Sequence, residues 1–126
     1  MVENSLSSKV TSLDECINVA SYRGASLKVC YTVSDNKIHL VALFTTPYVK
    51  DFDIGKATID SSNPTAVINS ESHCFERLHD FQGVVTMSFD FKINVLTISG
   101  KICIPLADCG EDKVSVLIPG IISTIN

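Results

Sequence analysis

Residues 26–45, SLKVCYTVSDNKIHLVALFT, contain the clearest fold signal in this 126-residue chain. The first half is apolar at every second position: Leu27, Val29, Tyr31 and Val33. This is the period of a strand that buries one face. Asp35 and Asn36 then tolerate the positive φ of a tight two-residue turn. The segment therefore predicts a β-hairpin.

The second half of this segment, residues 37–45, is apolar on both faces apart from His39. Such a strand is typical of the middle of a sheet that is covered on both sides. His39 is accordingly interpreted as a core histidine with a satisfied ring, and a role in a ligand pocket is the alternative.

Residues 84–91 and 95–104 show the same alternation around a three-residue loop at 92–94, so they predict a second hairpin. Gly100 within it marks a bulge or a close approach of backbone. The residues expected in the core are Leu27, Val29, Tyr31, Leu40, Ala42, Phe44, Val85, Met87, Phe89, Ile98, Ile102 and Ile104.

Two segments have a helical pattern. Ser12 and Glu15 form a capping box, Leu13, Ile17 and Ala20 follow on one face, and Gly24 can end a helix over 13–22. The stretch SHCFERLHDFQG (72–83) divides into an apolar side and a polar side when it is threaded on a helix. We therefore expect an N-terminal helix and a short mid-chain helix.

The remaining segments predict a loop at 46–55, short strands at 56–60 and 65–69, and an acidic loop at 106–112 before a last strand. The predicted fold is a single α+β domain over residues 1–126, in which β-structure predominates. It is a curved antiparallel sheet or half-open barrel of six to seven strands with the two helices. A flat β-sandwich is the second choice.

Composition narrows the possible functions. The net charge is −4 and the ten basic residues are scattered, so no basic stripe predicts binding to nucleic acid or to an anionic membrane surface. The longest apolar run, 114–123, is interrupted by Pro119 and Gly120 and is too short to span a bilayer. The N-terminal residues lack the pattern of a secretory signal. Five cysteines without a CxxC pair then predict reduced, mostly buried thiols in a cytoplasmic protein, and a disulfide somewhere in the chain is the alternative.

Reactive side chains are densest in residues 72–83, which contain His73, Cys74, His79 and Asp80. Their spacings are not those of a zinc site, and Cys74 and His79 lie on different sides of the expected helix. Asp51 and Asp53 resemble the start of a calcium loop, but its later ligands are missing. The sequence predicts no metal, no cofactor and no catalytic residues, and whether the chain is an enzyme stays uncertain, with the balance toward no.

The favoured function is a non-enzymatic binding or adaptor module that acts through protein–protein contacts. A carrier of a small apolar ligand inside a half-open barrel is the alternative, with a ligand-binding set of Tyr31, His39, Phe44 and Met87. A small enzyme that uses Cys74 and His79 is a further alternative.

The C-terminal stretch VSVLIPGII (114–122) is apolar on both faces, and an uncovered strand of that kind invites pairing with another chain. The sequence therefore predicts a homodimer. Its interface is expected at Val116, Leu117, Ile118 and Ile121.

Overall fold

The described part of the chain consists of β-strands joined by turns and loops. The computed structural model describes residues 15–70, 81–105 and 108–121. The strands are β2 (Glu15–Tyr22), β3 (Ala25–Ser34), β4 (Lys37–Thr46), β5 (Val49–Ile59), β6 (Thr65–Asn69), β7 (Gln82–Asp90), β8 (Val95–Cys103) and β9 (Cys109–Leu117). The predicted α+β class is therefore wrong, because the described chain is all-β.

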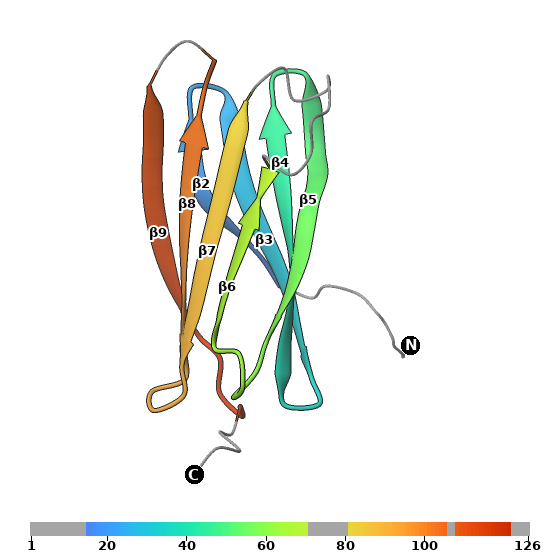
Figure 1. Cartoon of the computed structure of the whole chain (residues 1–126), viewed down its shortest axis with the longest axis vertical. Coiled ribbons are helices and arrows are strands. Elements are labelled where there is room, and N and C mark those ends of the chain that lie inside the picture. The colour runs from blue at the N-terminus through green and yellow to red at the C-terminus, as the bar shows by residue number, and fades with distance from the viewer. Residues whose placement is uncertain (1–14, 71–80, 106–107, 122–126) are drawn as a thin grey trace.

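The strands form two four-stranded antiparallel sheets, in the orders β2-β3-β4-β5 and β6-β7-β8-β9. Every hydrogen-bonded neighbour is also the next strand along the chain, so both sheets are meanders. The two sheets pack face to face as a sandwich (Figure 1). β5 lies beside β6 at one side, and β2 lies beside β9 at the other. The single curved sheet predicted from the sequence is replaced by the second choice, the β-sandwich.

The core lies between the two sheets and follows the alternation of the sequence. In β7, the side chains of Val85, Met87 and Phe89 are buried, whereas Thr86 and Ser88 between them are exposed. Most of the predicted core is confirmed as buried. Tyr31 and Ile104 are exceptions, since both are half-buried.

Glycines allow the sheets to approach closely. A Cβ at Gly83 would lie 2.9 Å from Leu27 Cδ2, and one at Gly100 would lie 2.9 Å from Val19 Cγ1. Real Cβ atoms essentially never come this close to another side chain. The close approach predicted at Gly100 is therefore confirmed, and the pairing of β8 with its neighbours is regular there rather than bulged.

The predicted helix over 13–22 is wrong for its described part, because residues from Glu15 onward form β2. Ile17 and Val19 also fit the period of a strand, and β-branched residues favour that state. Pairing with β3 supplies a tertiary partner that outweighs a weak helical preference. Arg23 (φ 47°) and Gly24 (φ 86°) form a tight turn between β2 and β3 instead of ending a helix.

Both predicted hairpins are confirmed. Asp35 (φ 53°) and Asn36 (φ 60°) take the left-handed conformation between β3 and β4. β7 and β8 pair around residues 91–94, and Asn94 has φ 57°. The predicted mid-chain helix falls mainly on residues 71–80, which lie outside the described residues.

The loop predicted at 46–55 is wrong, because β5 runs from Val49 to Ile59. Its pairing with β4 shifts register between Ala42 and Leu43, where Ile54 is the additional residue. Such a bulge breaks the alternation by which a strand is recognised in a sequence. The short strand predicted at 65–69 is confirmed as β6.

No helix in the described chain is long and apolar enough to cross a membrane.

Candidate interaction site

The four residues predicted to hold an apolar ligand do not gather at one site. Phe44 and Met87 are fully buried in the core. Tyr31 is half-buried and packs against the same core, and its burial raises the pKa of its hydroxyl. His39 lies on the outer face of the first sheet, where its Nδ1 is 3.4 Å from Thr58 Oγ1. The predicted satisfied ring is therefore found, but outside the core.

The residues expected to carry chemistry in 72–83 lie mainly outside the described residues, so Cys74, His73, His79 and Asp80 have no structural account. Within the described ranges, no three His, Cys, Asp or Glu side chains lie close enough together to hold a metal ion.

Four of the five cysteines form disulfides, which corrects the prediction of reduced thiols. Cys16 bonds to Cys30 and Cys103 bonds to Cys109. Each pair lies directly opposite in the ladder, so each disulfide joins neighbouring strands, β2 to β3 and β8 to β9. Cys16 lies seven residues before Arg23 and Cys30 six residues after Gly24, and the register shift between Asn18 and Ala20 brings the two cysteines opposite each other.

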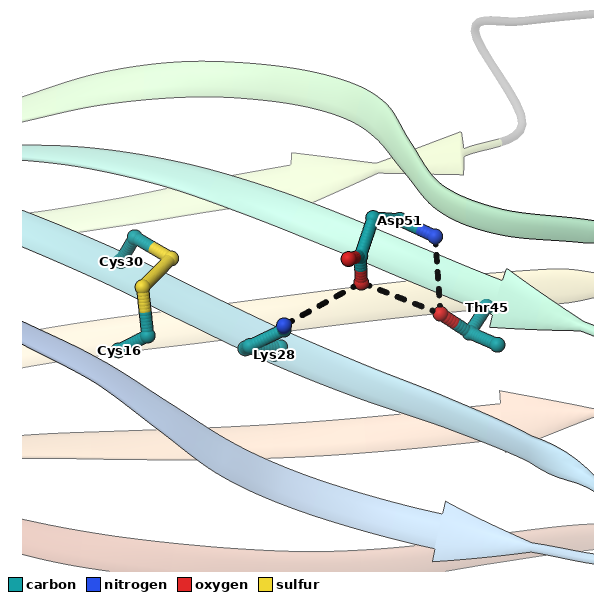
Figure 2. The surroundings of a disulfide bond; sticks show 5 residues. All are labelled: Cys16, Lys28, Cys30, Thr45 and Asp51. Carbon is teal, nitrogen blue, oxygen red and sulfur yellow. Dashed lines mark hydrogen bonds and ion pairs between the residues drawn. A yellow bond between two sulfur atoms is a disulfide. The ribbon is translucent and has the colours of Figure 1, made fainter.

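Figure 2 shows that the first disulfide shares its face of the sandwich with a small polar cluster. Lys28 Nζ lies 3.3 Å from Asp51 Oδ1, and the amide of Asp51 donates to Thr45 Oγ1 at 2.9 Å. These residues come from β3, β4 and β5. Asp51, which resembled a calcium ligand in the sequence, therefore ties three strands together.

A second polar cluster lies beside the other disulfide. Tyr22 donates a hydrogen bond to Asp108, which lowers the pKa of the Asp108 carboxyl and raises that of the Tyr22 hydroxyl. Arg23 Nη2 lies 4.0 Å from Asp108 Oδ2, and Arg23 Cζ lies over the Tyr22 ring, 5.5 Å from its centroid. The exposed Arg23 and Asp108, together with the half-buried Tyr22, connect the β2–β3 turn to the start of β9.

The predicted interface residues divide between the surface and the core. Leu117 is 65% exposed, Val116 is half-buried, and Ile118 and Ile121 are each 4% exposed. Ile118 and Ile121 belong to the core shared by both sheets. Leu117 is therefore the predicted interface residue most available to another chain.

The four edge strands of the two sheets differ in how well they are protected from pairing. Charged side chains and irregular pairing discourage the addition of another strand at an edge. β9 carries Glu111, Asp112 and Lys113 in succession. β5 carries four charged residues and two register shifts, and β2 begins with Glu15 and has one register shift.

β6 has none of these protections. Its sequence, TAVIN, is uncharged, and its pairing with β7 is regular. Val67, at its centre, is 64% exposed. Among the described residues β6 is hydrogen-bonded as a strand to β7 alone, and of the four described edge strands it carries the fewest features that discourage pairing.

The ladder shows which peptide groups face that edge. The amide of Phe89 donates to the carbonyl of Pro64 at 2.9 Å. Hydrogen-bonded pairs alternate along an antiparallel ladder, so Ala66 and Ile68 direct their peptide groups toward β7. Thr65 and Val67 direct theirs away from it. We take the edge at Thr65–Val67, called the β6 edge below, as the candidate site.

Comparisons of the chain with protein-family models, curated proteins and solved structures found no match to any of them.

Proposed function

We propose that this chain is a non-enzymatic binding module that accepts an extended segment of another protein at the β6 edge. The observation that carries the proposal is the contrast among the edges: β6 is uncharged and regular with an exposed Val67, whereas β2, β5 and β9 carry charges, register shifts or both. In this mode of recognition, main-chain hydrogen bonds supply affinity and alternate side chains supply specificity.

The packed interior favours a surface function over the carrier alternative. Phe44 and Met87 are fully buried, and Gly83 approaches both Leu27 and Phe44 so closely that a methyl group would not fit. A ligand cavity needs a few hundred cubic ångströms between the sheets. Two members of the predicted ligand set, Phe44 and Met87, are instead part of the packed core between the sheets.

The disulfides suggest where the module works. Disulfides form and persist in oxidising compartments and are rare in the cytosol. Two of them in one chain favour an oxidising compartment over the cytoplasm that the sequence predicted. Alkylation of the unreduced protein, followed by mass measurement, is expected to leave Cys16, Cys30, Cys103 and Cys109 unmodified. Modification of all four would contradict the disulfides and favour a cytoplasmic location instead.

A matched pair of proline variants tests the binding site. Val67→Pro removes an amide from the β6 edge and spares the ladder with β7. Leu117→Pro is the control, because the exposed fraction of Leu117, 65%, is nearly equal to that of Val67, 64%. Its peptide group also faces an open edge, since the neighbouring Ile118 amide donates to the Asn94 carbonyl within the sheet.

The probe is a random-peptide library selected on wild-type protein immobilised at low density. We expect the selected peptides to be extended and rich in β-branched residues, to lose binding to Val67→Pro and to keep it with Leu117→Pro. Circular dichroism checks that both variants retain the sheet. Equal binding to both variants would contradict a site at the β6 edge.

A further inference from the structure

The β6 edge is compatible with its own copy. We infer that the segment received there is β6 of a second molecule, related by a two-fold axis. The β6-β7-β8-β9 sheets of the two copies would then join into one continuous sheet. This inference rests on the proposed function, because it names the occupant of the same site. Its first support is electrostatic: β6 carries no charge, so pairing with itself sets no like charges opposite each other.

The direction of the peptide groups limits the register to pairs of residues that both face the open edge. Thr65 and Val67 face the open edge, as the bond from Phe89 to Pro64 implies. Placing Thr65 opposite Val67 of the second copy, and the reverse, lets both residues exchange their hydrogen bonds across the axis. An antiparallel pair of this kind is isologous, so it closes as a dimer and does not extend into a fibre.

Side-chain sizes agree with this register. Ala66 falls on the two-fold axis, opposite its own copy, in a pair that is not hydrogen-bonded. Side chains approach most closely in such pairs, with Cα atoms about 4.5 Å apart, and alanine is small enough to meet itself there. The missing amide of Pro64 does not weaken the proposed pairing with the second copy, because residue 64 directs its peptide groups toward β7 and away from the open edge.

The exposed surface around the axis also agrees. Val67, 64% exposed in one chain, would lie against Thr65 of the second copy, and pairs of β-branched residues favour sheet pairing. The neighbouring outward residues of β7, Thr86 and Ser88, are uncharged. The same pairing of β9 about its centre, Lys113, would set the two copies of this lysine directly opposite each other.

Light scattering after size-exclusion chromatography tests the inference with three chains: wild type, Val67→Lys and the matched control Leu117→Lys. We expect wild type and Leu117→Lys at tens of micromolar to have about twice the 13.7 kDa mass of one chain. Val67→Lys should be monomeric, because its two lysines would be diagonal neighbours across the axis, with Cα atoms roughly 7–8 Å apart, and like charges on paired strands oppose pairing.

The side chain of Val67 is exposed, so the lysine variant is expected to fold, and circular dichroism together with a wild-type-like thermal transition would establish that. A wild-type monomer, a dimeric Val67→Lys or a monomeric Leu117→Lys would each overturn the inference, and the last would place the interface on β9. If the library peptides depend on Val67 while the wild type is monomeric, the proposed function stands and the second copy is not the occupant.

Discussion

Gly110 in β9 allows the ring of Tyr22 in β2 to lie directly on the backbone of the opposite sheet. A Cβ at Gly110 would overlap the Cγ and Cδ1 atoms of that ring. We expect Gly110→Ala to lower the free energy of unfolding by about 1–3 kcal/mol, because the whole ring must move. Urea denaturation measures the loss. In a Tyr22→Ala background the same change should cost much less, and an equal loss in both backgrounds would contradict this contact.

Asp108 makes stability depend on pH. Its carboxyl pKa is lowered first by the hydrogen bond from Tyr22 and also by the charge of Arg23. A lowered carboxyl pKa contributes stability above the ordinary value of about 3.9, and this contribution is lost as the pH falls through the folded-state pKa. We expect Tyr22→Phe to raise the Asp108 pKa toward its ordinary value in an NMR titration. An unchanged pKa would mean that the hydrogen bond is not the main cause.

The two disulfides involve the first and last of the described strands, β2 and β9. β5 and β6 are joined directly through residues 60–64, whereas β2 and β9 are the first and last strands described and lie side by side without a direct link. Each of these two edge strands is bonded to its neighbour by one disulfide. The disulfides therefore reinforce each of these edge strands within its own sheet, and neither of them bridges the two sheets.

Loop length predicts which disulfide contributes more. The cysteines are 14 residues apart in Cys16–Cys30 and 6 apart in Cys103–Cys109. In the chain-entropy model these loops give about 3 and about 2 kcal/mol respectively. We expect a Cys16→Ser/Cys30→Ser chain to unfold at a lower urea concentration than a Cys103→Ser/Cys109→Ser chain, and the reverse order would contradict the model for this fold.

Elements were predictable where the residue pattern has one interpretation. The hairpin at Asp35–Asn36 combines strict alternation with residues that accept positive φ, and it was predicted correctly. β2 was not, because Ile17 and Ala20 fit a helical period while Ile17 and Val19 fit a strand. Only the pairing of β2 with β3, the next strand along the chain, decides between the two patterns. The first part of β5 was missed because its bulge at Ile54 interrupts the alternation, whereas the strand predicted at 56–60 coincides with its end.

The candidate site was predictable in part. The sequence predicts a strand at 65–69, but not that this strand lies at an edge, since edge position depends on how the strands divide between two sheets. The predicted interface at 114–122 failed to anticipate that Ile118 and Ile121 enter the shared core. An apolar strand end can bury itself in its own sandwich, and no local pattern distinguishes that outcome from exposure to a partner.

At the scale of the whole molecule, the two sheets depend on close packing across one core. Phe44 is fully buried, and its ring atoms Cε2 and Cζ would lie 3.3 Å from a Cβ at Gly83. Phe44→Ala is expected to lower the free energy of unfolding by about 3–5 kcal/mol, because a cavity remains between the sheets. Denaturant titration checks this loss, and one below about 1 kcal/mol would mean that the core is looser than described.

The central claim is a sandwich with one open, self-pairing edge at β6, and amide hydrogen exchange measured by NMR at two protein concentrations tests it most directly. In dilute solution, Ala66 and Ile68 should be protected by their bonds to β7, whereas Thr65 and Val67 should exchange rapidly. At tens of micromolar, Thr65 and Val67 should become protected while the edge amide of Ser115 in β9 does not. Rapid exchange at Ala66 and Ile68, or concentration-dependent protection at Ser115 in place of Val67, would contradict the account.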